Sequence, residues 1–161
     1  MTEKYPIPGV ALVLFNRDGD KILLAKRLLS SHENLKYGCP GGKVENGHTL
    51  LETVYKELQE ETGLEEKDLT VSPKMMGFIS SNYYSNIDQQ FICLWFSSQL
   101  KEEKEICFIE KNNEGKNKTE KWGFFSLEDI KNLDLMTDTY EVVEKIINRR
   151  LFEVKIKDNV I

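Results

Sequence analysis

One stretch, PGGKVENGHTLLETVYKELQEETGL at positions 40–64, restricts what this chain can fold into more than any other segment. The Pro-Gly-Gly at its start predicts a tight turn that a ligand can approach closely. Thr49 and Glu52 have the spacing of a capping box, in which two side chains satisfy backbone amides at the start of a helix. Gly63 is the residue type that most often ends a helix in the left-handed conformation. The stretch therefore predicts a continuous helix over Leu50–Thr62.

This helix carries two kinds of side chain on neighbouring arcs. Apolar residues share one arc, namely Leu51, Val54, Tyr55 and Leu58. Spacings of three and four residues bring Glu57, Glu60 and Glu61 together on the adjacent arc. Carboxylates this close repel one another unless a cation lies between them, and Mg²⁺ takes oxygen ligands of this kind. The alternative is a solvated acidic face, but Gly42 and Gly63 at fixed spacing around the glutamates favour the metal site.

At these positions the sequence resembles the Nudix hydrolases, whose signature combines a glycine, a glutamate and the run Arg-Glu-aliphatic-x-Glu-Glu-x-Gly-aliphatic. The matching residues are Gly42, Glu57, Leu58, Glu60, Glu61, Gly63 and Leu64. Two positions depart from the signature, because His48 stands where the family has glutamate and Lys56 where it has arginine. The resemblance is strong over residues 40–64 and continues more weakly from Gly9 to the segment that begins at Trp122.

The resemblance implies a chemistry and a set of metal ligands. Nudix hydrolases cleave a nucleoside diphosphate linked to another group, with Mg²⁺, or Mn²⁺ in its place, neutralising the phosphate oxygens. The three helix glutamates would be the main metal ligands and the catalytic carboxylates, with a backbone carbonyl of Gly41 or Gly42 as an addition. A further glutamate is expected shortly before Trp122, and Glu114 is slightly favoured over Glu120, with Glu110 more remote. Which carboxylate is the general base stays open.

The two departures bear on activity. Lys56 offers a point charge in place of the planar fork by which arginine orients a carboxylate. His48 supplies no anionic oxygen, although neighbouring Glu45 could partly substitute for it. Lower activity, a shifted substrate and a nucleotide-binding module without turnover are all compatible with these changes. Because the three metal-side glutamates are present, we expect an active enzyme.

Length and composition set the broader limits. The chain has 161 residues and is most simply one domain over residues 1–161. Its net charge of -5 argues against nucleic acid as a partner and leaves a small nucleotide substrate open. The three cysteines form no C-x-x-C pair, so zinc is not expected, and no apolar run is long enough for a membrane span. We expect a cytoplasmic protein that is a monomer or a homodimer.

The remaining segments alternate between strands and helices, which predicts an α/β fold with a mixed sheet. The resemblance implies the α/β/α sandwich of the Nudix family. A hairpin is expected over 9–27, strands over 69–80, 88–99 and 122–125, a short strand over 106–109, and a helix capped by Ser126. A second helix should start at Thr137 or Asp138, and the tail 152–157 alternates like a strand.

Four residues outside the signature are candidates for substrate contact. Lys26 and Arg27 follow a strand and either contact phosphate or lie in solvent. Tyr83 belongs to the polar and aromatic segment 81–87, which could stack on a base or pack on the sheet. Asp138 lies in a segment that resembles a purine-contacting part of some relatives, although a helix N-cap is the simpler interpretation. His32, alone in a polar loop, is expected to be a surface residue.

The compact outline is most similar to the small MutT-type enzymes, which implies cleavage of a purine nucleoside triphosphate to monophosphate and pyrophosphate, as in the removal of damaged nucleotides. Other Nudix substrates remain as alternatives: ADP-ribose, a nucleotide sugar, a dinucleoside polyphosphate or capped RNA. A weakly active nucleotide-binding module is the alternative from another class.

Overall fold

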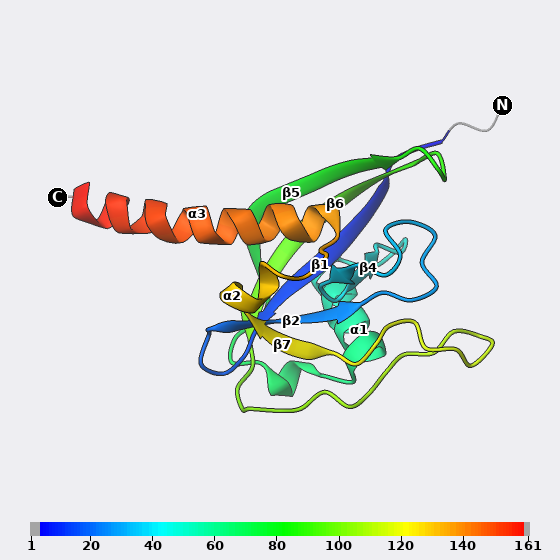
Figure 1. The fold of residues 1–161 in the computed structure, drawn as a ribbon, viewed down its shortest axis with the longest axis horizontal. Helices are drawn as coiled ribbons and strands as arrows, with labels where there is room; N and C mark the ends of the chain where they lie inside the picture. The colour runs from blue at the N-terminus through cyan, green and yellow to red at the C-terminus, as the bar shows by residue number, and fades with distance from the viewer. Residues whose placement is uncertain (1–3, 160–161) are drawn as a thin grey trace.

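The computed structural model describes residues 4–159, and its centre is one seven-stranded sheet (Figure 1). The strands are β1 Ile7–Phe15, β2 Lys21–Lys26, β3 Tyr37–Gly38, β4 Gly41–Lys43, β5 Lys74–Tyr84, β6 Gln89–Gln99 and β7 Gly123–Ser126. Their order is β3-β2-β1-β6-β5, with β4 also paired to β1 and β7 to β2. β1 and β6 run parallel, while β1 pairs antiparallel with β2. The predicted mixed sheet is confirmed.

The first two strands form the predicted hairpin, and its turn is closed by a side chain. Asn16 Oδ1 accepts hydrogen bonds from the backbone amides of Asp20 and Lys21, each at 3.0 Å. Gly19 takes the positive φ of 74° that the turn requires. Local sequence therefore determines this hairpin.

The helices are α1 Leu50–Thr62, the short 3₁₀ turn η1 Glu66–Asp68, α2 Leu127–Ile130 and α3 Thr137–Asn159. The bounds of α1 are those predicted. Thr49 Oγ1 accepts from the amide of Glu52 at 3.1 Å, and the Glu52 carboxylate accepts from the amide of Thr49 at 2.8 Å. Gly63 ends the helix with a φ of 75°. The predicted Ser126 cap of α2 is also present.

Helices cover both faces of the sheet, because alternate side chains of the central strand point to opposite sides. Leu12 and Leu14 of β1 belong to the core cluster that includes Val54 and Leu58 of α1. Their neighbours Ala11 and Val13 belong to the second cluster, which includes Val142 and Ile146 of α3 and Ile130 of α2. The predicted α/β/α sandwich is confirmed.

Three local predictions were wrong. The tail 152–157 continues α3, because a helix that has started gains a hydrogen bond with each added residue and a short alternation does not stop it. β5 begins at Lys74 and runs to Tyr84, so the first part of segment 81–87, expected to link two strands, belongs to β5 itself. Residues 106–109 form no strand, and burial of Ile106 in the core holds that segment.

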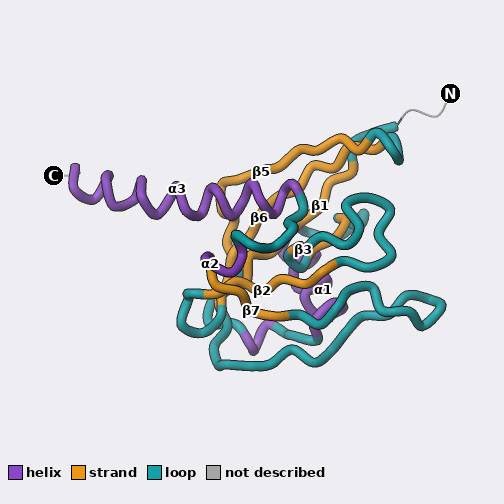
Figure 2. The backbone as a smooth tube through the Cα atoms, in the orientation of Figure 1, coloured by secondary structure: helices purple, strands orange, loops and turns teal. Residues whose placement is uncertain are grey.

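Long loops follow β2 and β6 and extend toward the same end of the molecule (Figure 2). The amide of Leu28 donates to the carbonyl of Lys118 at 2.8 Å, which joins the two loops. They surround the end of the sheet near β4 and α1. Among the described residues, no helix combines the length and the apolar character that crossing a membrane requires.

Candidate active site

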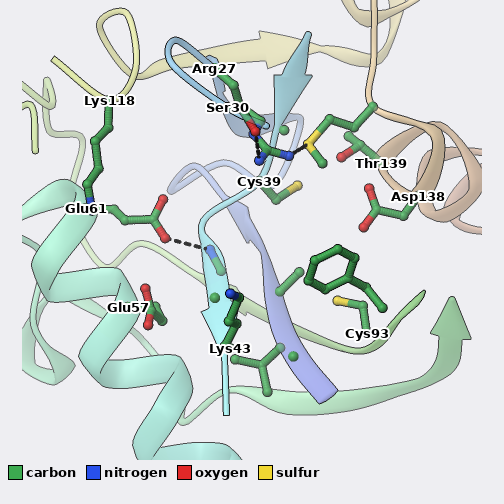
Figure 3. Close-up of a pocket in the computed structure, with 18 of the residues that line it drawn as sticks. Arg27, Ser30, Cys39, Lys43, Glu57, Glu61, Cys93, Lys118, Asp138 and Thr139 are labelled. Atoms are coloured by element: carbon green, nitrogen blue, oxygen red, sulfur yellow. Dashed lines mark hydrogen bonds between the residues drawn. The ribbon is translucent and has the colours of Figure 1, made fainter. Parts of the chain in front are cut away.

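A cavity of about 640 Å³ opens where these loops meet the sheet. Its lining comes from β1, β4, α1, β5, β6, the first turn of α3 and both long loops. Figure 3 shows Glu57 and Glu61 on one side of it, Asp138, Thr139 and Cys93 on the other, and the thiol of Cys39 between them. The cavity therefore has two chemically different ends.

The acidic end is built by α1 and the glycines of β4. Gly41 donates its amide hydrogen to Glu61 Oε1 at 2.9 Å (Figure 3). A Cβ at Gly42 would lie 2.4 Å from the carboxyl carbon of Glu57, so only glycine leaves that side chain its place. Trp122 Nε1 donates to the backbone carbonyl of Glu61 at 3.1 Å. The glycines after Pro40 thus allow the side chains of the acidic helix to approach the backbone of β4 closely.

The two carboxyl groups at this end have raised pKa values. Burial, and then the charge of Glu60, raises the pKa of Glu57 to about 7. Burial raises the pKa of Glu61 well above its ordinary value, and the charges of Glu57 and Glu110 add to this, while the hydrogen bond from Gly41 opposes it. Negative charge is therefore under-compensated here, as at a site that holds a cation.

Glu60, the third glutamate of the signature, is held differently. Its side chain is 46% exposed, and Lys56 Nζ lies 3.6 Å from Glu60 Oε1. Lys56 Nζ also contacts Glu45 Oε1 at 2.8 Å, and His48 Nδ1 lies 3.8 Å from Glu45. Over the described residues, no three histidine, cysteine or carboxylate side chains converge as a closed ligand set. Glu60 also lines the cavity, and it must give up its ion pair with Lys56 to join Glu57 and Glu61 in such a set.

The long loop after β6 brings a different glutamate to the cavity than the one favoured from sequence. Glu110 lines the cavity, and its Oε1 accepts from Lys118 Nζ at 2.8 Å. Glu114 lies outside the lining, with a side chain that is 72% exposed and 3.4 Å from Lys116. Glu120 pairs with Lys26 at 3.8 Å. The backbone pairing of Lys118 with Glu110, at 2.9 Å, turns the loop so that Glu110 faces α1.

Arg27 and Asp138 lie at the other end of the cavity, while Lys26 does not line it. Arg27 donates to the hydroxyl of Ser30 and packs against the sulfur of Met136. Asp138 lies in the first turn of α3, which begins at Thr137. Its Oδ1 is buried without a hydrogen-bond partner in the protein, and burial raises its pKa to about 6. A buried carboxyl oxygen without a partner is costly, which suits a group that meets a ligand.

Tyr84, and not Tyr83, faces the cavity. Tyr83 is 60% exposed and donates its hydroxyl to Asp88 at 2.7 Å. Side chains along a strand alternate between its two faces, and Ser80, Asn82 and Tyr84, on one face of β5, all line the cavity. If the strand predicted from the sequence had continued past residue 80, side-chain alternation would have placed Tyr84 on the same face as Ser80.

His32 is not the isolated surface residue that was expected. Its ring lies 4.9 Å from that of Phe91, in a stacked arrangement, and 4.5 Å from that of Tyr84. All three rings line the cavity, so they form an aromatic wall near Arg27. No motif indicated this wall, because its members come from a loop and two strands.

Comparisons with known proteins agree with the signature. The family model described as the NUDIX domain matches residues 6–146. An RNA pyrophosphohydrolase from Pelagibacter ubique is 28% identical over 156 residues, which cover 91% of each chain. An 8-oxo-dGTP diphosphatase from Escherichia coli is 30% identical over 87 residues, which cover 54% of this chain and 61% of that protein.

The fold is likewise similar to a solved structure. A MutT protein from Methanosarcina mazei superimposes with a TM-score of 0.69 over 93% of this chain and 98% of the other, at 22% identity. At 22% identity, this similarity supports the fold alone.

Proposed function

This chain belongs to the Nudix family of hydrolases, and we propose that its substrate is a purine nucleoside triphosphate, which it cleaves to the monophosphate and pyrophosphate with Mg²⁺ or Mn²⁺. Family membership supports the general reaction, which is hydrolysis of a phosphoric anhydride linked to a nucleoside. The finer proposal rests on one observation: a single cavity of about 640 Å³ joins the acidic end to the end that holds Asp138.

The acidic end fits a divalent metal ion. Glu57 and Glu61 are oxygen donors whose pKa values are raised by burial and by neighbouring negative charge. A hard cation relieves that repulsion and prefers such ligands. When bound, Mg²⁺ offsets the charge that develops on the phosphate oxygens. Glu57, Glu61 and, once released from Lys56, Glu60 would hold the metal, with Glu110 as the loop carboxylate beside them.

The opposite end fits a purine base. Asp138 presents a buried oxygen without a protein partner, and its pKa of about 6 lets the carboxyl group carry a proton in part of the molecules near neutral pH. A carboxyl group in that state can both donate to and accept from the edge of a base. The rings of Tyr84, Phe91 and His32 offer faces for stacking. Such a pocket distinguishes a purine from a bare phosphate chain.

The proposal is tested with a panel of substrates, each with Mg²⁺ and with Mn²⁺. The panel contains purine, oxidised purine and pyrimidine nucleoside triphosphates, ADP-ribose, a dinucleoside polyphosphate and a 5′-triphosphorylated RNA. We expect pyrophosphate from the purine triphosphates, with kcat/KM about tenfold or more above that for pyrimidines, since one good hydrogen-bonded base contact contributes about 1–3 kcal/mol of discrimination. A Glu57→Gln preparation, purified in parallel, shows the background.

Other outcomes contradict the proposal. Orthophosphate in place of pyrophosphate would mean cleavage of a different bond. Turnover confined to ADP-ribose, the dinucleotide or the RNA would assign another Nudix substrate, and nucleotide binding without turnover would assign a binding module.

A further inference from the structure

A buried carboxylate outside the cavity joins three segments of the fold. Glu33 lies in the loop after β2, and its side chain is 8% exposed. Its Oε1 accepts from the amide of Thr137 at 2.8 Å and from the Thr137 hydroxyl, and its Oε2 accepts from the Tyr84 hydroxyl at 2.6 Å. Glu33 is absent from the residues that line the cavity. It therefore does not contact a ligand in the cavity directly, and acts on the site through the groups that it holds and through its charge.

The contact with Thr137 fixes the start of α3. The first amides of a helix have no partner inside the helix, and a carboxylate there also interacts favourably with the helix dipole. Thr137 is the first residue of α3, and Asp138 follows it directly. The place of the Asp138 carboxyl group in the cavity thus depends on the hydrogen bonds that Glu33 accepts.

The loop that carries Glu33 is strained without these contacts. Leu29, Glu33 and Leu35 have φ values of 59°, 47° and 63°. Residues other than glycine rarely adopt such backbone conformations, which persist only where surrounding contacts impose them. Asn86 donates to the carbonyl of Ser31 at 3.0 Å and adds a second tie from the β5–β6 turn. The loop conformation is therefore maintained by contacts with distant segments, and the Glu33 carboxylate supplies the most numerous of them.

We propose that Glu33 is a positioning residue for base recognition, which holds Asp138 and Tyr84 where they meet the base. The inference rests on the proposed purine-binding role of this end of the cavity. The negative charge of Glu33 also acts on Asp138 directly, because it raises the pKa of the Asp138 carboxyl group. The other groups that influence or respond to the Asp138 charge are Arg27, Glu141, Tyr84 and the thiols of Cys39 and Cys93.

Glu33→Gln tests the inference, because the amide keeps the size of the side chain and loses its charge and one acceptor oxygen. We expect KM for a purine nucleoside triphosphate to rise about tenfold, as for loss of a charged hydrogen bond, while kcat changes less than about twofold. The inflection of KM with pH that reports Asp138 should move to lower pH, because a neighbouring negative charge is gone. A general loss of structure would not move that inflection in a defined direction.

A double-mutant cycle separates positioning from independent effects. Binding of a purine nucleoside monophosphate is measured by calorimetry in chelator for wild type, Glu33→Gln, Asp138→Asn and the double variant. Because Glu33 acts in part through Asp138 and in part through Tyr84, the double variant should lose less affinity than the sum of the two single losses. Thr137→Ala removes one donor to Glu33 and should weaken binding about threefold in the same direction. Glu128→Gln, on the exposed face of α2, is the matched control and should bind like wild type.

The outcomes are distinguishable from failure of the proposed function. Wild type that binds the monophosphate and hydrolyses no purine triphosphate would overturn the substrate proposal, and the binding cycle would still decide the role of Glu33. Additive losses in the cycle, unchanged affinity in a folded Glu33→Gln variant, or a loss in kcat with KM unchanged would overturn the inference. So would wild type that binds no purine ligand.

Discussion

Glu57→Gln should make the metal-free protein more stable above pH 7 while it abolishes most turnover. The pKa of Glu57 is raised from 4.5 to about 7, first by burial and then by Glu60. Between these values the folded chain binds a proton that the unfolded chain has released. Stability therefore falls as the pH rises from about 4.5 to about 7, and the full penalty applies above that range.

The size of the penalty follows from the displaced pKa. For a fully shielded group the displacement corresponds to about 3 kcal/mol, and solvent screening of this partly exposed carboxylate reduces it to about 1–2 kcal/mol. In a domain of this size that free energy moves the melting temperature by about 2–8 °C. Glutamine has no charge to desolvate, so the variant should melt higher than wild type at pH 8 in EDTA and equally at pH 5.

The assay is a set of thermal melts at pH 5 and pH 8, in EDTA and in Mg²⁺, with turnover measured on the same preparations. Mg²⁺ should raise the melting temperature of wild type more at pH 8 than at pH 5, and should raise that of the variant far less. Glu66→Gln, an exposed change outside the cavity, should behave as wild type throughout. Equal wild-type melts at both pH values in EDTA, or a variant that Mg²⁺ stabilises as much as wild type, would refute the reasoning.

Four further changes separate chemistry from folding. Glu60→Gln should lower kcat at least about 100-fold and shift the free energy of unfolding by less than about 0.5 kcal/mol, as for an exposed ion pair, which paired kinetics and melts in chelator will show. Gly42→Ala should displace the Glu57 carboxylate and lower turnover with a small loss of stability. Gly41→Ala would place a Cβ 2.3 Å from a backbone oxygen of β1, so it should destabilise the fold by more than about 2 kcal/mol in urea titrations. Leu58→Ala, in the core under α1, should cost about 2–5 kcal/mol in the same titrations, with kcat at low temperature retained.

The sequence alone determined the elements whose causes are local. The capping box at Thr49 and the left-handed Gly63 bound α1 as predicted, because each acts within one turn of the helix. The hairpin of β1 and β2 was equally readable from its turn. The signature glutamates were also found from spacing, since a helix repeats every 3.6 residues wherever it lies.

Tertiary structure decided which residues face the cavity from outside α1. Glu110 lines the cavity and Glu114 does not, because Lys118 pairs with Glu110 within the loop after β6 and turns that segment toward α1. Tyr84 faces inward because β5 extends past the point where the sequence placed a loop. Asp138 reaches the far end because α3 packs on the sheet opposite α1.

The same holds for Glu33, which has no recognisable motif. Its partner Thr137 is 104 positions away in the chain. A contact at that separation forms only after the sheet has brought the loop after β2 beside α3. Its energy therefore comes from the assembled fold, and no local pattern in the sequence indicates it. Spacing within one helix encodes the acidic end of the cavity, whereas long-range packing creates the end proposed to bind the base.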